Sequence, residues 1–78
     1  MSRIQDKARA LIASKMKLDE SEITPEKNIF KDLGADSLDF VELSMLLERE
    51  FNVKFTEKDT ANVKTVSDLY ELIEHYVK

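Results

Sequence analysis

The residues that could do chemistry lie in one short run, 33–43, which contains the only glycine of the 78-residue chain. Gly34 can adopt a positive φ without a steric penalty, which allows a sharp turn there. Asp36 can then cap the backbone N–H groups at the start of a helix that runs to about Phe51. Ser37 follows at the first helical position, where the helix dipole and free amides would stabilise an anion bonded to its hydroxyl. The run is therefore suited to carry a phosphate ester on Ser37.

The same run resembles the attachment motif of acyl carrier proteins. Asp32-Leu33-Gly34-Ala35 is followed by Asp36-Ser37-Leu38, with an acidic helix beyond it. In that family the serine carries a phosphopantetheine arm, which comes from coenzyme A and ends in a thiol that holds acyl groups as thioesters. The resemblance implies that Ser37 is the modified residue, that Asp36 and Leu38 flank it in the motif, and that the chain is a carrier and not an enzyme.

One helix over about 37–51 must position this serine, and its apolar side chains form two arcs at about 100° per residue. The first arc is a core-facing stripe of four large side chains: Phe40, Leu43, Leu47 and Phe51. The second arc lies on nearly the opposite side and contains three apolar side chains: Leu38, Val41 and Met45. A helix in so small a domain cannot readily bury both arcs.

The second arc has two explanations. Either it packs against the short third helix or the neighbouring loop, or it is an exposed apolar patch with an acidic rim, as in surfaces that bind partners. The resemblance favours the second, because the helix after the serine is the main recognition helix of carrier proteins. Met45 suits it, because a flexible thioether can adapt to several partners. We therefore expect a partner-binding surface made of five residues: Asp39, Val41, Glu42, Met45 and Glu48.

The net charge of the chain is carried by the same helix. Residues 36–50 hold five acids and one base, Arg49, so this segment alone accounts for the net charge of −4. Such a chain lacks the basic footprint that nucleic acid requires and suits partners that present lysine or arginine. The alternative is an acidic face that only aids solubility. The resemblance implies a phosphopantetheinyl transferase as partner, together with acyl-loading, condensing and acyl-transfer enzymes that have basic docking surfaces.

A first helix and a long connection precede the motif. Ser2 and Gln5 form a capping-box pattern for a helix that ends near Lys17. The face of this helix opposite its apolar stripe is interpreted as solvated surface: Asp6, Lys7, Arg9, Ser14 and Lys15. The connection over residues 18–36 is expected to be held to the core by three apolar side chains: Ile29, Phe30 and Leu33.

Two more helices follow the central one. Thr56 and Asp59 form a capping-box pattern for a very short helix that reaches about Val63 and has little besides Ala61 and Val63 to bury. We expect this helix to be the least stable element. Thr65 opens the last helix, and the pattern buries six of its side chains: Val66, Leu69, Tyr70, Ile73, Tyr76 and Val77.

These elements predict an all-α fold over a single domain, 1–78. It is a small four-helix bundle with three longer helices, a short third helix and a long first connection. Cysteine is absent and His75 is the only histidine, so disulfides are excluded and a metal site is not expected. No apolar run is long enough for a signal peptide or a membrane span. We expect a soluble, cytoplasmic monomer without stable membrane insertion.

Three functions follow from the motif and its surroundings. The run from Gly34 to Leu43 and the lack of attached domains resemble carriers of dissociated fatty acid biosynthesis. Arg49 within the acidic helix, and Phe40 at a position that is often smaller, depart from that pattern, so a specialised carrier for a polyketide, aminoacyl or dedicated lipid pathway stays open. An unmodified helical interaction module is the third interpretation, with Ser37 as an ordinary first-turn residue. A serine hydrolase is disfavoured, because no glycine-flanked nucleophile elbow surrounds Ser37.

Overall fold

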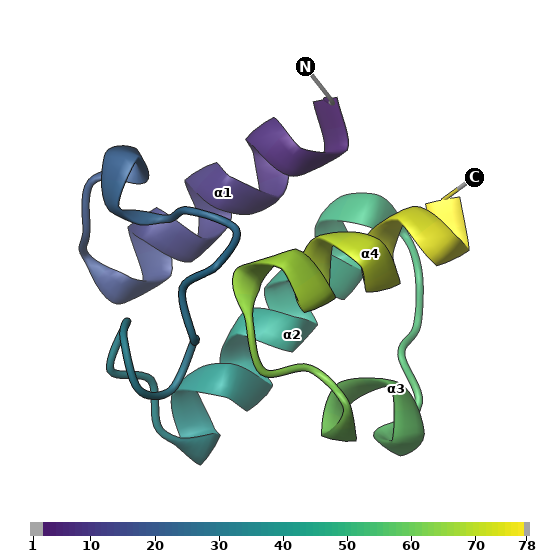
Figure 1. Ribbon diagram of the computed structural model, residues 1–78. Helices are drawn as coiled ribbons and strands as arrows, with labels where there is room; N and C mark the ends of the chain where they lie inside the picture. Colours follow the sequence, from purple (N-terminus) through teal and green to yellow (C-terminus); the bar gives the residue numbers. More distant parts are fainter. Residues whose placement is uncertain (1–2, 78) are drawn as a thin grey trace.

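The computed structural model describes residues 3–77, which form four α-helices and one short 3₁₀ helix (Figure 1). The elements are α1 (Arg3–Met16), η1 (Glu20–Glu22), α2 (Ser37–Phe51), α3 (Glu57–Ala61) and α4 (Val66–Val77). Within 3–77 the only β-type pairing is one isolated bridge between Asn28 and Thr65. The predicted all-α bundle with a short third helix and a long first connection is therefore confirmed. Ser2, half of the predicted first capping box, lies outside the described residues.

The core lies between α1, α2 and α4, and α3 covers one end of it (Figure 1). Its largest fully buried side chains come from all three long helices and from the first connection: Ile12, Ile29, Leu43, Leu47, Val66, Leu69 and Ile73. Burial of one such side chain contributes about 1.5–3 kcal/mol to stability. The helix packing therefore fixes the orientation of α2, whose first turn carries the motif. No helix in the described part of the chain is both long and apolar enough to cross a membrane.

The ends of the helices follow local side-chain chemistry. Thr56 and Asp59 form a reciprocal capping box at the start of α3, and Thr65 and Asp68 form the same pair at the start of α4. Asn52 ends α2 with φ 55°, the left-handed conformation that asparagine adopts more readily than most residues. The caps predicted at Thr56 and Thr65 are confirmed, although α3 stops at Ala61 rather than near residue 63.

The first connection is hydrogen-bonded to the loop between α3 and α4 and also packs into the core. Ile29 N donates to Lys64 O at 2.8 Å and Val66 N donates to Lys27 O at 3.0 Å. Ile29 and Leu33 are buried as predicted, but Phe30 is 37% exposed. The prediction for Phe30 is therefore wrong: its ring lies outside the core and packs against Phe40 instead. The connection thus lies against the loop that joins α3 to α4.

The last turn of α4 differs from the predicted pattern. Tyr76 and Val77 are 37% and 41% exposed rather than buried. The Tyr76 ring packs against Phe55, with centroids 5.8 Å apart, and its hydroxyl donates to Asp59 of α3. The apolar stripe of α4 thus extends beyond the core, and the hydrogen bond from Tyr76 to Asp59 links α4 to α3. Ala61 is also exposed, so Val63 is the buried residue that anchors this short element.

Candidate functional site

Ser37 is held at the start of α2 by the turn that precedes it. Gly34 has φ +79°, and a Cβ placed there would meet no atom within 4 Å, so the backbone conformation and not the space requires glycine. On either side of Gly34, Leu33 and Ala35 are buried, and Ala35 N donates to Ile29 O at 3.1 Å. The turn is therefore anchored in the core, while Ser37 itself is exposed.

A capping box defines the first turn of α2. Asp36 Oδ1 accepts from Asp39 N at 2.8 Å, and Asp39 Oδ2 accepts from Asp36 N at 3.2 Å. The Asp36 carbonyl also accepts from Phe40 N at 3.0 Å. Because the first amides of an α-helix have no carbonyl partner within the helix, those of Ser37 and Leu38 remain available to an anion on the Ser37 hydroxyl. The predicted cap at Asp36 is confirmed.

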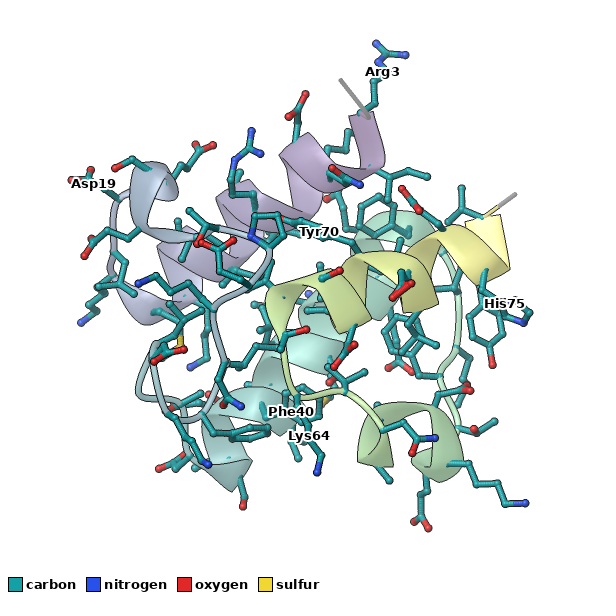
Figure 2. All side chains as sticks on the ribbon, in the orientation of Figure 1. Arg3, Asp19, Phe40, Lys64, Tyr70 and His75 are labelled. Atoms are coloured by element: carbon teal, nitrogen blue, oxygen red, sulfur yellow. The ribbon has the colours of Figure 1, made fainter. Side chains whose placement is uncertain are left out.

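An open cleft of about 520 Å³ lies beside Ser37. Its apolar wall comes from three parts of the chain: Phe30 of the first connection, Phe40 of α2, and Val63 after α3. Three charged residues also line the cleft: Lys31, Lys64 and Glu57. Figure 2 shows Phe40 and Lys64 at the same end of the molecule, with His75 well away from them on the last turn of α4. The structure therefore brings cationic and apolar groups, but no histidine, to the predicted site.

The residues around Ser37 fit a phosphopantetheine group. Ser37 is exposed, as attachment by an external enzyme requires. The helix amides and the two lysines of the cleft complement a phosphate, and the apolar wall complements an uncharged arm. No group of three or more His, Cys, Asp or Glu that could hold a metal ion occurs among residues 3–77. The geometry at the start of α2 is thus compatible with a covalent group on Ser37.

The second apolar arc of α2 is exposed. Leu38 retains 65% of its accessible surface, Val41 52% and Met45 56%. The explanation in which this arc is packed against the short third helix or the neighbouring loop is therefore wrong, although Val41 lines the cleft together with Thr60 and Ala61 of α3. An apolar patch of Leu38, Val41 and Met45 next to Ser37 is the kind of surface that binds a partner. We call it the α2 patch.

The acids beside the α2 patch have an ion-pair partner within the chain. Lys15 Nζ lies 2.6 Å from Glu42 Oε1 and 3.7 Å from Asp39 Oδ1. The Lys15 side chain is only 22% exposed, so its assignment to a solvated face is wrong. The hydrogen bond to Glu42 raises the pKa of Lys15. Sequence periodicity could not identify this contact, because it depends on how α1 packs against α2.

The remaining acids of α2 also have partners. Glu48 accepts from Phe55 N at 2.7 Å and so holds the segment that leaves α2. Glu50 lies 3.4 Å from Lys7 Nζ. The acidic rim predicted for docking thus consists of carboxylates with internal partners, and Glu48 also has a clear structural role.

Known proteins share both the sequence and the fold. A family model described as the phosphopantetheine attachment site matches residues 6–73. An acyl carrier protein from Buchnera aphidicola subsp. Baizongia pistaciae is 40% identical over 77 residues, covering 99% of each chain. A solved structure from Mycobacterium tuberculosis, assigned as an acyl carrier protein, has a TM-score of 0.88 and 32% identity, covering 92% of this chain and 96% of that one.

The match includes the attachment turn, α2, α3 and most of α4, so it covers the whole of the geometry described above. Two independent comparisons, of sequence and of structure, point to the same class of protein. The chain therefore belongs to the acyl carrier protein family, whose members carry acyl groups on a covalently attached phosphopantetheine and are not enzymes.

Proposed function

We propose that Ser37 is the residue that bears phosphopantetheine in this chain. The observation that carries the proposal is the exposed Ser37 hydroxyl at the first position of α2, beside the cleft formed with Phe30, Phe40 and Val63. When attached, the arm supplies a thiol that holds acyl groups as thioesters. The chain itself presents the serine on a rigid turn, with helix amides and Lys31 and Lys64 nearby to complement the phosphate charge.

The cleft wall gives the chain a means of shielding a bound apolar group from water. Phe30 and Phe40 lie with ring centroids 5.3 Å apart at an angle of 49°. Together with Val63 they present apolar surface directly beside Ser37. Contact with such surface is favourable at roughly 25 cal/mol per Å² removed from water. The cleft can therefore hold part of an arm or a short acyl chain without any rearrangement of the core.

The pathway we propose is fatty acid biosynthesis by separate enzymes, between which the loaded protein moves. The supporting observation is the 40% identity to a bacterial acyl carrier protein along nearly the whole of both chains. A specialised carrier is the second candidate, for a polyketide, aminoacyl or dedicated lipid pathway. The specific observation in its favour is the Phe30–Phe40 pair, which occupies space beside Ser37 that a long acyl chain would otherwise use.

The proposed docking surface is the α2 patch with its acidic rim. Leu38, Val41 and Met45 supply apolar contact, and Asp39, Glu42 and Glu48 supply negative charge for enzymes with basic surfaces. Such charge acts mainly on the rate of encounter and on partner choice. Phosphopantetheinyl transferase must reach Ser37 itself, so it would cover the Leu38 end of the patch.

Intact mass measurement tests the proposal directly. The protein is incubated with coenzyme A, Mg²⁺ and a broad-specificity phosphopantetheinyl transferase. We expect the wild type to gain the mass of one phosphopantetheine group and Ser37→Ala to gain none. An unchanged wild-type mass would instead support an unmodified interaction module, and a mass gain by Ser37→Ala would place the attachment elsewhere. The acyl group found on protein purified from its native host would then distinguish the two pathway candidates.

A further inference from the structure

Lys15 is the one residue of α1 that forms an ion pair with the rim beside Ser37. Its ammonium lies 2.6 Å from Glu42 Oε1 and 3.7 Å from Asp39 Oδ1, so it bridges two carboxylates one turn apart on α2. They are the first two acids of α2 after Ser37. One internal cation therefore serves two acids that we have assigned to docking.

The position of Lys15 is fixed by more than its charge. Its side chain is 22% exposed, against 61% for Lys7, which makes the other α1–α2 ion pair. Lys15 lines a groove together with Glu42, Met45, Leu46 and Arg49. Apolar contact along the stem keeps the ammonium at the rim, as is usual for a long charged side chain that covers apolar surface.

The geometry points to Lys15 as an internal competitor for docking: it occupies the place on Asp39 and Glu42 that a basic side chain of a partner enzyme would take. The inference rests on the proposed function, because it treats α2 as the surface that enzymes bind. A partner that uses these acids must displace Lys15 or share them with it. Partners that rely on apolar contact with Leu38, Val41 and Met45 are not affected in this way.

This competition makes Lys15 a specificity-determining residue. Like charges that meet at an interface are unfavourable, so a partner cation aimed at Asp39 also meets the Lys15 ammonium. The effect on encounter is strongest at low salt and weakens as ions screen the rim. Wild-type protein is thereby biased toward partners that need little positive charge at this edge.

Replacement of Lys15 by methionine tests the inference, because methionine keeps the apolar stem and removes the ammonium. Lys7→Met is the matched control: it changes the net charge by the same amount and removes an α1–α2 ion pair, but beside Glu50 and away from the α2 patch. Phosphopantetheine transfer is followed for both variants and the wild type at low and high salt. We expect Lys15→Met to increase kcat/KM about threefold at low salt, mainly through KM, with little change for Lys7→Met.

Equal rates for Lys15→Met and the wild type, with both fully loaded, would overturn the inference and leave the proposed function intact. A complete lack of loading in all variants would instead count against the proposed function. The competition is then decided by fluorescence anisotropy with a lysine-rich amphipathic peptide as the probe. Tighter binding to Lys15→Met than to Lys7→Met supports it, and equal affinities overturn it. Lys15→Arg should behave as the wild type in both measurements.

Discussion

The aromatic rings of Phe30 and Phe40 meet with centroids 5.3 Å apart at the edge of the cleft beside Ser37. Phe30 comes from the first connection and Phe40 from the first turn of α2, so the contact closes the gap between these segments. Phe40 is half-buried, whereas Phe30 is 37% exposed. The exposed member of the pair can therefore be removed without opening the core, which makes the cleft experimentally adjustable.

Phe30→Ala should widen the cleft and improve its ability to shelter an acyl chain. Because Phe30 lies outside the buried core and is partly exposed, we expect the unloaded protein to lose only about 1 kcal/mol of unfolding free energy. Loading with a long saturated acyl chain should then raise the melting temperature more in the variant than in the wild type, since bound groups stabilise the folded state. Equal shifts on loading in both proteins would show that the pair does not limit the space available.

Tyr70→Phe should leave the protein as stable as the wild type or increase its unfolding free energy by about 1 kcal/mol. Tyr70 is 4% exposed, and its hydroxyl has no hydrogen-bond partner within residues 3–77. Burial raises the pKa of this phenol, although the nearby Arg9 guanidinium opposes the rise. Phenylalanine keeps the ring packing and removes the unsatisfied group, and urea unfolding measures the result.

Ile73→Val is the control for that measurement, because it removes one methylene from a fully buried side chain of the same helix. Ile73→Val should lower the unfolding free energy by about 1 kcal/mol. A loss of similar size for Tyr70→Phe would mean that the hydroxyl is satisfied in solution.

Local patterns were sufficient to predict most of the fold. The caps at Asp36, Thr56 and Thr65 depend on residues only three positions apart, and the core stripe of α2 depends on helical periodicity. Both signals are present in the sequence without any tertiary information. The pattern was wrong at Tyr76, because periodicity shows which face a residue occupies but not whether another helix extends far enough to cover it.

The site was predicted only in part, for the same reason. The exposed serine turn follows from Gly34 and Asp36, both within a few residues of Ser37. The Lys15–Glu42 pair joins residues 27 positions apart, and the sequence holds many such pairs of opposite charge. Only the packing of α1 on α2 selects this one, so the internal neutralisation of the rim could not be predicted from the sequence.

Asp68 should make stability depend on pH in the acidic range. The backbone amides of Thr65 and Lys64 donate to its carboxylate at 3.1 and 3.0 Å, and these bonds lower the pKa of Asp68 in the folded state. Because the pKa of Asp68 is lower in the folded state, its carboxylate stabilises the fold fully at pH values above the unfolded-state pKa of about 3.9. This stabilisation is lost as the pH falls through the folded-state pKa.

Asp68→Asn should therefore be less stable than the wild type at pH 7, and the difference should shrink below about pH 4. Urea unfolding at a series of pH values measures it. Glu71→Gln, on the exposed side of α4, serves as the control and should track the wild type throughout. A difference for Asp68→Asn that stays constant down to pH 3 would argue against the role of the carboxylate.

Glu48 and Glu42 should respond differently to removal of their charge, although both belong to the proposed acidic rim. Glu48 accepts from Phe55 N at 2.7 Å, and this bond fixes the chain between α2 and α3. The Glu42 side chain is 50% exposed, and within residues 3–77 its one partner is Lys15. We expect Glu48→Ala to lose about 1.5 kcal/mol of unfolding free energy, as for a hydrogen bond to a charged group. Glu42→Ala should leave the urea midpoint unchanged and instead slow phosphopantetheine transfer at low salt.

An unchanged unfolding free energy for Glu48→Ala would mean that the Glu48 carboxylate is free in solution to bind partners. Loading of Glu42→Ala at the wild-type rate would mean that the acids near Ser37 do not guide the transferase.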